Sequence, residues 1–482
     1  MEKVSLKSVL KNCFLSIVVQ LVSLITSFVL GFIVPKFIHE LDYAYWQMYT
    51  MYVTYSGVLH FGILDGLILR YAGTDYADLD RERMRSQLTV VFLLNALSAV
   101  GMSFLAYHTL ERNYFIIVAL FAVAVITKNV FLYFSYLLQI TNRIKYYAKS
   151  VIVQRGAYLV AVAVLLLAGA KEFYWYCLAD IVGDLCGILC GAFYNKGLYL
   201  GRLESPAKAL RETWRNFRVG VFLLIANFSS MFIAGGAKLI IQMRWGDLVF
   251  GKASFSFSVV NIFISFVAAI SIVLFPSLKR LGTEELAPLY AKIRNVISPV
   301  MFVALLGYFP LAKILAWWLP HYAESVVYLG VLLPMMIFTS KVGILTDNYL
   351  KAYRRERMML WVNLACMTVA LVAFVLGAYV FDQLDIVIYA VVFAVMLRSV
   401  ISEILVTRIV GKVPYFDFVI ELIMSLGFIA VARYLSLLVG FLVYLAIVAL
   451  YVVLKRKALL AVLAPLWRSL RGKKAPAKSE EH

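Results

Sequence analysis

The feature that most constrains this chain is a series of long apolar runs that recur from one end of the sequence to the other. A helix needs about 20 apolar residues to cross the roughly 30 Å hydrocarbon core of a bilayer. Backbone groups cannot stay unpaired in lipid, and these runs are continuous rather than alternating, so they are expected to be helices. The sequence therefore predicts an all-α polytopic membrane protein with about fourteen transmembrane helices. The predicted spans are residues 13–34, 46–69, 88–108, 114–139, 150–169, 173–195, 219–242, 250–275, 294–318, 324–348, 360–380, 384–408, 415–434 and 436–454.

Composition argues against the alternative of several soluble domains. Of the 482 residues, 63% are hydrophobic and 15% are charged, whereas soluble domains are about half apolar and about a quarter charged. The largest polar insertion runs only from Lys196 to Arg218. The net charge of +19 lies in short inter-span loops and at the C-terminal tail, which is typical of membrane topology and not of nucleic-acid binding.

Basic residues concentrate in every second loop, which predicts the orientation of the spans. Cytoplasmic loops of membrane proteins carry an excess of Lys and Arg. With the N-terminus placed inside, most of the 46 basic residues fall in cytoplasmic segments, and both termini are cytoplasmic. The outer loops hold Lys36, Arg112, Lys171, Arg244, Lys252 and Arg433. A multi-pass membrane protein with both termini in the cytoplasm is therefore expected.

A weak internal repeat predicts the domain organisation. GLILRYAG (66–73) and LFPSLKRLG (274–282) each close a span at a basic loop. The pattern predicts two six-helix bundles of the same orientation, unless all basic inner loops simply resemble one another. The expected divisions are an N-terminal bundle (1–195), a cytoplasmic amphipathic linker (196–218), a C-terminal bundle (219–408), helices 13 and 14 (409–455) and a basic cytoplasmic tail (456–482).

Several stretches resemble a known family. They are TSFVLGFIVPKFIHELDYAYWQMY (26–49), FGILDGLILRYAG (61–73), LLQITNRIKYYAKS (137–150) and LFPSLKRLG (274–282). With a six-plus-six-plus-two layout, the chain resembles the polysaccharide-exporter branch of the multidrug/oligosaccharidyl-lipid/polysaccharide (MOP) superfamily. That branch often carries an acidic residue midway along span 7, where this chain reads AGGAKLII with Lys238. The departure weakens the case for ion coupling at span 7.

The resemblance implies a function in transport. Members of the branch are flippases that move polyprenyl-pyrophosphate-linked oligosaccharides from the cytoplasmic to the outer leaflet. Their products are lipopolysaccharide O-antigen, capsule or exopolysaccharide. The resemblance also implies a V-shaped cavity between the bundles and alternating access. Implied partners are the lipid-linked oligosaccharide, membrane lipids, H⁺ or Na⁺, and polysaccharide-assembly proteins, with no cofactor.

Basic residues inside predicted spans are the candidate substrate site. Ionisable residues within a membrane are costly and usually face an interior or a wet cavity. A pyrophosphate headgroup needs compensating positive charge, which Arg supplies through paired hydrogen bonds and Lys through a point charge. The candidates for a cationic central cavity are Lys128, Arg155, Lys238, Lys341 and Arg398.

Acidic residues inside predicted spans have two interpretations, ion coupling or structural charge pairing. They are Asp65, Asp180, Asp184 and Glu403. Asp180 and Asp184 lie one turn apart, so they are placed to neutralise Lys128 and Arg155. Asp65 is a candidate either for coupling or for pairing with Arg70, and at five residues from His60 it is not expected to share a helix face with that histidine.

Enzymatic motifs are missing from the sequence. It contains no GxxxxGK[ST], HExxH, GxSxG or metal-spaced His/Cys cluster, and its five cysteines form no CxxC pair. We therefore expect a non-enzyme driven by an ion gradient, the substrate gradient or a partner. The alternatives are an ion-coupled drug or metabolite antiporter of the same superfamily and a membrane polysaccharide polymerase or ligase. The last would need a sizeable external loop, which the spacing of the spans does not leave room for.

Overall fold

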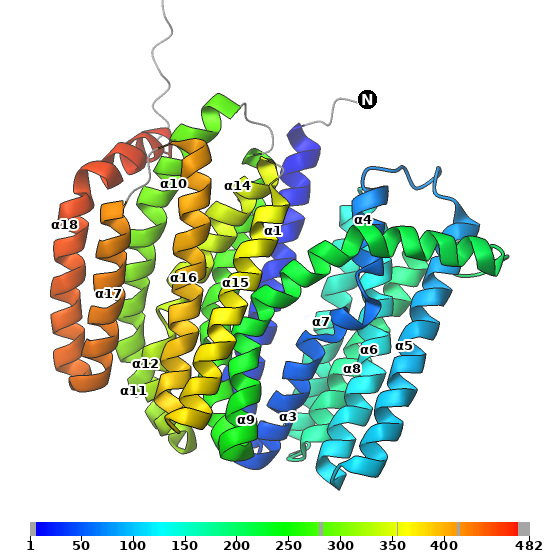
Figure 1. Cartoon of the computed structure of the whole chain (residues 1–482), viewed down its shortest axis with the longest axis horizontal. Coiled ribbons are helices and arrows are strands. Elements are labelled where there is room, and N and C mark those ends of the chain that lie inside the picture. The colour runs from blue at the N-terminus through cyan, green and yellow to red at the C-terminus, as the bar shows by residue number, and fades with distance from the viewer. Residues whose placement is uncertain (1–5, 279–282, 354, 412–414, 471–482) are drawn as a thin grey trace, which may run out of the picture.

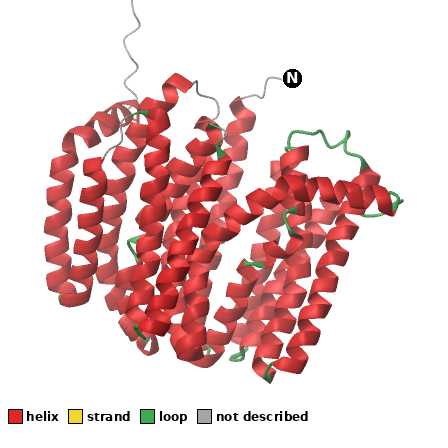
Figure 2. Cartoon of the chain, in the orientation of Figure 1, coloured by secondary structure: helices red, strands yellow, loops and turns green. Residues whose placement is uncertain are grey.

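The computed structural model describes residues 6–278, 283–353, 355–411 and 415–470. Over these residues the chain is helical apart from short loops and turns, and no strand occurs among them (Figure 2). The all-α polytopic class predicted from the apolar runs is thus confirmed. The helices stand roughly parallel to one another, as expected for segments that cross a bilayer together (Figure 1).

The elements follow one another along the chain without long interruptions. The first part comprises α1 (Leu6–Phe28), η1 (Val29–Ile33), α2 (Val34–Phe37), α3 (Glu40–Thr54), η2 (Ser56–His60), α4 (Ile63–Tyr71), α5 (Arg81–Thr109), α6 (Arg112–Ile140), α7 (Ile144–Leu167), α8 (Phe173–Tyr194) and α9 (Pro206–Leu278). The second part comprises α10 (Thr283–Ala304), η3 (Leu305–Gly307), α11 (Tyr308–Trp318), η4 (Pro320–Tyr322), α12 (Ala323–Leu332), α13 (Met335–Lys341), η5 (Val342–Thr346), α14 (Asp347–Ala352), α15 (Glu356–Val375), η6 (Leu376–Val380), α16 (Leu384–Val410), α17 (Tyr415–Tyr434) and α18 (Leu437–Leu470).

The number of membrane crossings follows from helix length. Eleven helical stretches of the described chain are long and apolar enough to cross a membrane, and two further bent pairs each qualify as one span. One of the eleven, Pro206–Ser265, has 60 residues, which at 1.5 Å per residue is about 90 Å and far exceeds one bilayer. Its backbone is non-helical at Gly246 (φ 82°), so α9 consists of two arms. Counting both arms gives fourteen crossings, in agreement with the sequence.

The two arms of α9 run in opposite directions. Figure 1 shows the first arm lying across the upper end of the molecule and then descending to the lower end. Helix α10 begins at the upper end, only five residues after α9 finishes at Leu278. A link of that length spans less than about 18 Å. The second arm must therefore return upward after Gly246.

Span 2 is broken within the membrane. The segment formed by α3 and η2 meets α4 at an angle of 61°. The break falls at Phe61 and Gly62, which have φ angles of 51° and 79°. A left-handed conformation ends an α-helix, and Gly adopts it at little cost whereas Phe does not. The second bent pair, α12 with α13, meets at 44° next to Pro334, which cannot donate a backbone hydrogen bond.

The helices form two groups with α9 connecting them (Figure 1). Helices α3–α8 lie on the right of the view, α10–α18 lie on the left, and α1 stands between them in contact with both α7 and α9. Helices α17 and α18 form the outermost pair on the left. This grouping places the first and second arms of α9 along the boundary where the two groups meet.

The two groups are joined firmly at the lower end. Lys36 Nζ donates to the carbonyl oxygen of Trp318 at 2.7 Å, and Trp318 Nε1 donates to the carbonyl oxygen of Phe32 at 3.0 Å. The Tyr43 and Tyr322 rings meet edge to face with centroids 5.3 Å apart. We call these contacts the lower seal.

Candidate functional site

The first cavity lies between the two groups of helices. It has a volume of about 300 Å³ and is lined by residues of α3, both arms of α9, α13 and α16. Among the described residues, Lys238 and Arg398 are its only charged lining residues. Both were predicted from the sequence as candidate substrate ligands, and no carboxylate lines the cavity with them. The arrangement favours an anion in this space.

Neither of these cations is fully neutralised. Arg398 Nη1 donates to Ser230 Oγ at 2.6 Å, while Nη2 lies 3.7 Å from Asp347 Oδ2. The Nε of Arg398 is buried without a partner. Lys238 Nζ lies 5.2 Å from the centroid of the Phe257 ring and forms no ion pair with any described residue. A buried guanidinium with an unused donor is costly unless a ligand satisfies it.

The second cavity lies between α1 and the first group of helices and is lined by residues of α1, η2, α6 and α7. Its volume is about 520 Å³, and its charged lining residues are Lys128 and Arg155. Arg155 Nε is buried without a hydrogen-bond partner, and Arg155 forms no ion pair with any described residue. Within the described part of the chain, this cavity too is lined by cations and by no carboxylate.

Lys128 is neutralised by two carboxylates that do not line the cavity. Its Nζ donates to Asp180 Oδ1 at 2.8 Å and to Asp184 Oδ1 at 3.0 Å. Asp184 is fully buried and also accepts from Thr127 at 3.0 Å and from Gln154 at 2.7 Å. The pairing predicted for Lys128 is therefore present. The pairing suggested for Arg155 is not found, so Arg155 is the cation of this cavity that remains free for a ligand.

Lys341 and Glu403 lie elsewhere, in a buried ion-pair cluster. Lys341 Nζ contacts Glu421 Oε2 at 2.5 Å and Glu403 Oε2 at 2.6 Å. Arg294 contacts Asp417 at 2.5 Å and also pairs with Glu403. Lys341 is 1% exposed and lines neither cavity. Its charge is fully engaged with carboxylates, so we do not retain it as a substrate ligand.

The cluster contains partners that the sequence analysis missed. They are Arg294, Asp417, Glu421 and Lys455. Arg294 stood at the edge of a predicted span, where a basic residue is unremarkable. Glu421 lay well inside the predicted span 415–434, and a carboxylate in an apolar run is a signal that would have identified it. Arg398 does not belong to this cluster and lies 3.7 Å from Asp347 instead.

His60 and Asp65 are closer than a continuous helix would allow. His60 Nε2 lies 4.0 Å from Asp65 Oδ2, with both side chains almost entirely buried. The expectation that they do not share a face is wrong because the left-handed residues Phe61 and Gly62 break the helix between them. Asp65 does not pair with Arg70, which instead contacts Glu212 at 2.7 Å. Asp65 lines neither of the two cavities.

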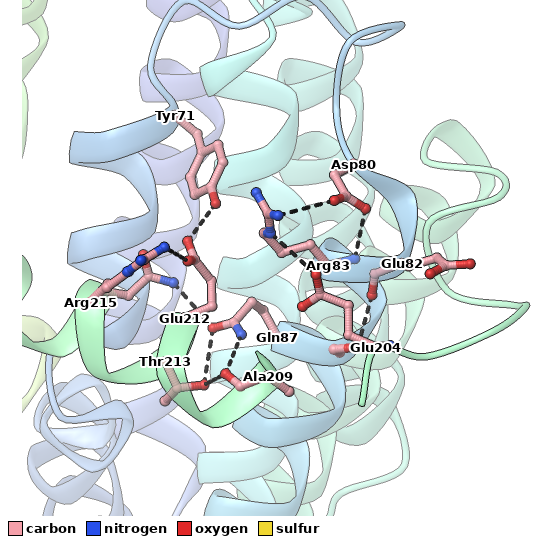
Figure 3. Close-up of polar contacts among 12 residues, drawn as sticks. Tyr71, Asp80, Glu82, Arg83, Gln87, Glu204, Ala209, Glu212, Thr213 and Arg215 are labelled. Atoms are coloured by element: carbon pink, nitrogen blue, oxygen red, sulfur yellow. Dashed lines mark hydrogen bonds and ion pairs between the residues drawn. The ribbon is translucent and has the colours of Figure 1, made fainter. Parts of the chain in front are cut away.

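The first arm of α9 is fixed to the upper ends of α4 and α5 (Figure 3). Glu212 accepts from Tyr71 Oη at 2.6 Å, and Arg83 contacts Glu204 at 3.4 Å. Gln87 donates to the carbonyl oxygen of Ala209 at 3.1 Å. The segment predicted as an amphipathic linker is therefore helical from Pro206 onward and anchored to the first group of helices by polar contacts.

Comparison with solved structures identifies the fold. No family model and no curated protein sequence matches the chain. An inward-facing multidrug resistance MATE family transporter of the MOP superfamily matches with a TM-score of 0.59 at 11% identity, covering 82% of this chain and 98% of its own. An outward-facing structure of a MATE transporter gives a TM-score of 0.56 at 10% identity, covering 83% and 95%.

A lipid flippase covers more of this chain than the MATE transporters do. The lipid II flippase MurJ in an inward closed conformation matches with a TM-score of 0.55 at 10% identity, covering 96% of this chain and 100% of its own. The chain therefore has the fold of the MOP-superfamily transporters, and the superfamily fold expected from the sequence resemblance is confirmed. At these identities the likeness establishes the fold alone.

Proposed function

We propose that this chain is a flippase that moves polyprenyl-pyrophosphate-linked oligosaccharides across the bacterial inner membrane for cell-surface polysaccharide synthesis. The observation that carries the proposal is the pair of cavities lined by Arg155, Lys238 and Arg398 and by no carboxylate. A pyrophosphate is an anion with several acceptor oxygens, and guanidinium groups with unused donors match it. A cationic drug would be repelled from the same walls.

The extent of the structural likeness supports a flippase over a drug antiporter. MurJ is named a lipid II flippase and matches nearly the whole chain, whereas the MATE structures leave a larger part unmatched. The inward-facing MATE structure gives the higher TM-score, so the score alone does not separate the two classes. The charge of the cavities favours the flippase, because lining cations match an anionic substrate better than a cationic drug.

The proposal includes the orientation and division of the chain. The upper end in Figure 1 carries the N-terminus and the basic loops, and we assign it to the cytoplasm. The bundles 1–195 and 219–408 move relative to each other about the cavity between them, with 196–218 connecting them. The lower seal corresponds to a state closed toward the outer face. O-antigen, capsule and exopolysaccharide repeat units all fit the proposal, with H⁺ or Na⁺ as coupling ion.

Deletion of the gene in its host and complementation with variants test the proposal. The deletion is expected to leave lipid-linked repeat units on the inner leaflet and to abolish surface polysaccharide, and the wild-type chain restores it. Arg398→Gln and Lys238→Met are expected to lower export about tenfold or more, because each removes a charge-assisted contact of about 1.5–3 kcal/mol. The measurement is surface polysaccharide together with the leaflet distribution of the lipid-linked intermediate.

A matched variant controls for the loss of a membrane lysine. Lys313 of α11 is exposed and lines no cavity, so Lys313→Met is expected to restore export fully. Normal translocation with shortened polysaccharide chains in the deletion strain would indicate a polymerase. Increased drug sensitivity with normal polysaccharide would indicate an antiporter. Either result would overturn the flippase.

A further inference from the structure

Two helices at the boundary between the two groups carry the same pattern of uncharged polar residues. Helix α1 has Gln20, Ser23 and Ser27, and α3 repeats the spacing with Gln47, Thr50 and Thr54. In each case the residues stand at positions i, i+3 and i+7, which share one face of a helix. In an apolar span such a face is expected to turn away from lipid.

Every residue of this pattern lines a cavity. Gln20 and Ser23 line the 520 Å³ cavity, and Thr54 lines the 300 Å³ cavity. The remaining three, Ser27, Gln47 and Thr50, line a third cavity of about 170 Å³. Because α1 and α3 belong to successive spans and run in opposite directions, the polar faces together follow the depth of the molecule past both sets of cations.

The third cavity has no charged residue among the described residues that line it. Besides the pattern it is lined by Trp46, Ser258 and Asn261 and by two small or apolar residues. Asn261 also lines the cavity that contains Lys238 and Arg398, so the two spaces adjoin. The exposed Asn261 amide has no hydrogen-bond partner among the described residues. An amide that offers both a donor and an acceptor in a water-sized space is a typical ligand-orienting group.

The hydrogen bonds of these residues decide what they present to a ligand. Ser23 donates to the carbonyl oxygen of Val19 at 3.0 Å, and Thr54 donates to that of Thr50 at 2.9 Å. Their hydroxyl hydrogens are engaged within their own helices, which leaves oxygen lone pairs as acceptors. Gln47 Oε1 accepts from Ser258 Oγ over a long distance of 3.4 Å, so this hydrogen bond is weak. The walls thus offer many neutral acceptors and a few amide donors.

A ligand group that matches these walls must be uncharged and rich in hydroxyls. A hydroxyl both donates and accepts, so it can meet acceptor-rich walls without bringing a charge into a neutral space. A second anion would find no cation in the third cavity, and a purely apolar group would leave the amides of Gln47 and Asn261 unsatisfied. Sugar rings have the required chemistry.

We infer that Gln20, Ser23, Ser27, Gln47, Thr50 and Thr54 form a neutral hydrogen-bonding track that receives the sugar portion of the substrate. Arg155, Lys238 and Arg398 hold the anionic portion beside it. The inference rests on the proposed function and adds the subsite that binds the sugar portion of the substrate. Packing alone would explain Ser and Thr that bond back to their own helix, but it does not explain why all six residues of two matched faces line cavities.

Binding of two matched lipids to the purified full-length protein tests the track. The probes are farnesyl pyrophosphate and farnesyl pyrophosphate carrying one N-acetylglucosamine. We expect the wild-type protein to bind the glycosylated probe more tightly. Gln47→Leu and Thr50→Val are each expected to weaken binding of that probe by about five- to thirtyfold, which corresponds to one or two buried hydrogen bonds. Binding of bare farnesyl pyrophosphate is expected to stay unchanged.

Thr368→Val is the matched control. Thr368 on α15 is exposed and bonds back to the carbonyl oxygen of Leu364 at 3.0 Å, as Thr54 does on α3, but it lines no cavity. The Thr368→Val variant should bind both probes as the wild-type protein does. Equal wild-type affinity for both probes, or an equal loss for both probes in the variants, would overturn the track alone. Failure of the wild-type protein to bind either probe would overturn the proposed function together with the track.

Discussion

Single charged residues in this membrane protein have two different roles, and their neighbours show which. Lys341 and Lys128 each contact two carboxylates. Arg155 and Lys238 contact none among the described residues and line cavities. A buried charge that is fully paired supports structure, whereas a charge with unused hydrogen-bond donors beside a cavity is available to a ligand. Substitutions at the two kinds of residue should therefore fail in different ways.

Lys341→Met is expected to destabilise the protein. The substitution leaves Glu403 and Glu421 facing Arg294 alone in a buried site, and an uncompensated buried charge costs about 3–5 kcal/mol. The measurement is the free energy of unfolding in mixed detergent micelles. Lys313→Met is the control, since Lys313 is exposed and has no ion pair among the described residues. If Lys341→Met is as stable as the control, the ion-pair cluster does not hold α17 and α18 to the rest of the fold.

The sequence predicted which charges matter better than it predicted their partners. Hydropathy is a local property, so Arg155, Lys238 and Arg398 stood out as cations inside apolar runs. Their partners depend on how distant helices rotate against one another, which no local pattern encodes. Asp347 lay near the end of a predicted span, yet it faces Arg398. Arg294 lay at the end of another predicted span, yet it pairs with Glu403.

Helices are placed by close approaches that allow no side chain. Where α4 meets the first arm of α9, a Cβ added to Gly66 would overlap the backbone of Asn216, and one added to Gly220 would overlap that of Gly62. The backbones are thus in direct contact at this crossing, in the manner of small-residue interfaces in membranes. The polar contacts of Glu212 and Gln87 hold the same arm of α9 to α4 and α5 (Figure 3).

Gly66→Ala and Gly220→Ala are expected to lower stability by about 1–3 kcal/mol, because each forces the two backbones apart. The measurement is the thermal unfolding temperature of the purified protein. Gly101→Ala on α5 serves as the control. A Cβ there meets nothing within 4 Å, so the substitution should be neutral or should stabilise the helix by up to about 1 kcal/mol. Unchanged stability in all three variants would show that the crossing is free to separate.

The breaks in the helices were not visible in the sequence for a physical reason. Gly246 divides α9 into two arms, but it is one of 27 glycines and nothing local marks it. The break at Phe61 requires a left-handed phenylalanine, which only the surrounding packing can impose. Span number and order were predictable because they follow from the lengths of apolar runs.

The two groups of helices contact each other at the lower end of the molecule, through the lower seal. At the lower seal, Lys36 Nζ also lies 5.1 Å from the centroid of the Trp318 ring. Removing these side chains in the double variant Lys36→Ala/Trp318→Ala deletes two hydrogen-bond donors and a cation–π contact, about 1–3 kcal/mol in total. If the halves alternate, the population open at the lower end should rise about five- to 150-fold.

The measurement uses Asn261→Cys in sealed vesicles. Opening at the lower end is expected to make this cysteine react faster with a membrane-impermeant maleimide added to the face opposite the N-terminus. Lys313→Ala/Trp317→Ala alters the neighbouring exposed pair on the same helix, which contributes none of the seal contacts described above, and should leave the labelling rate unchanged. Equal rates in both double variants would mean that the halves do not separate at this end.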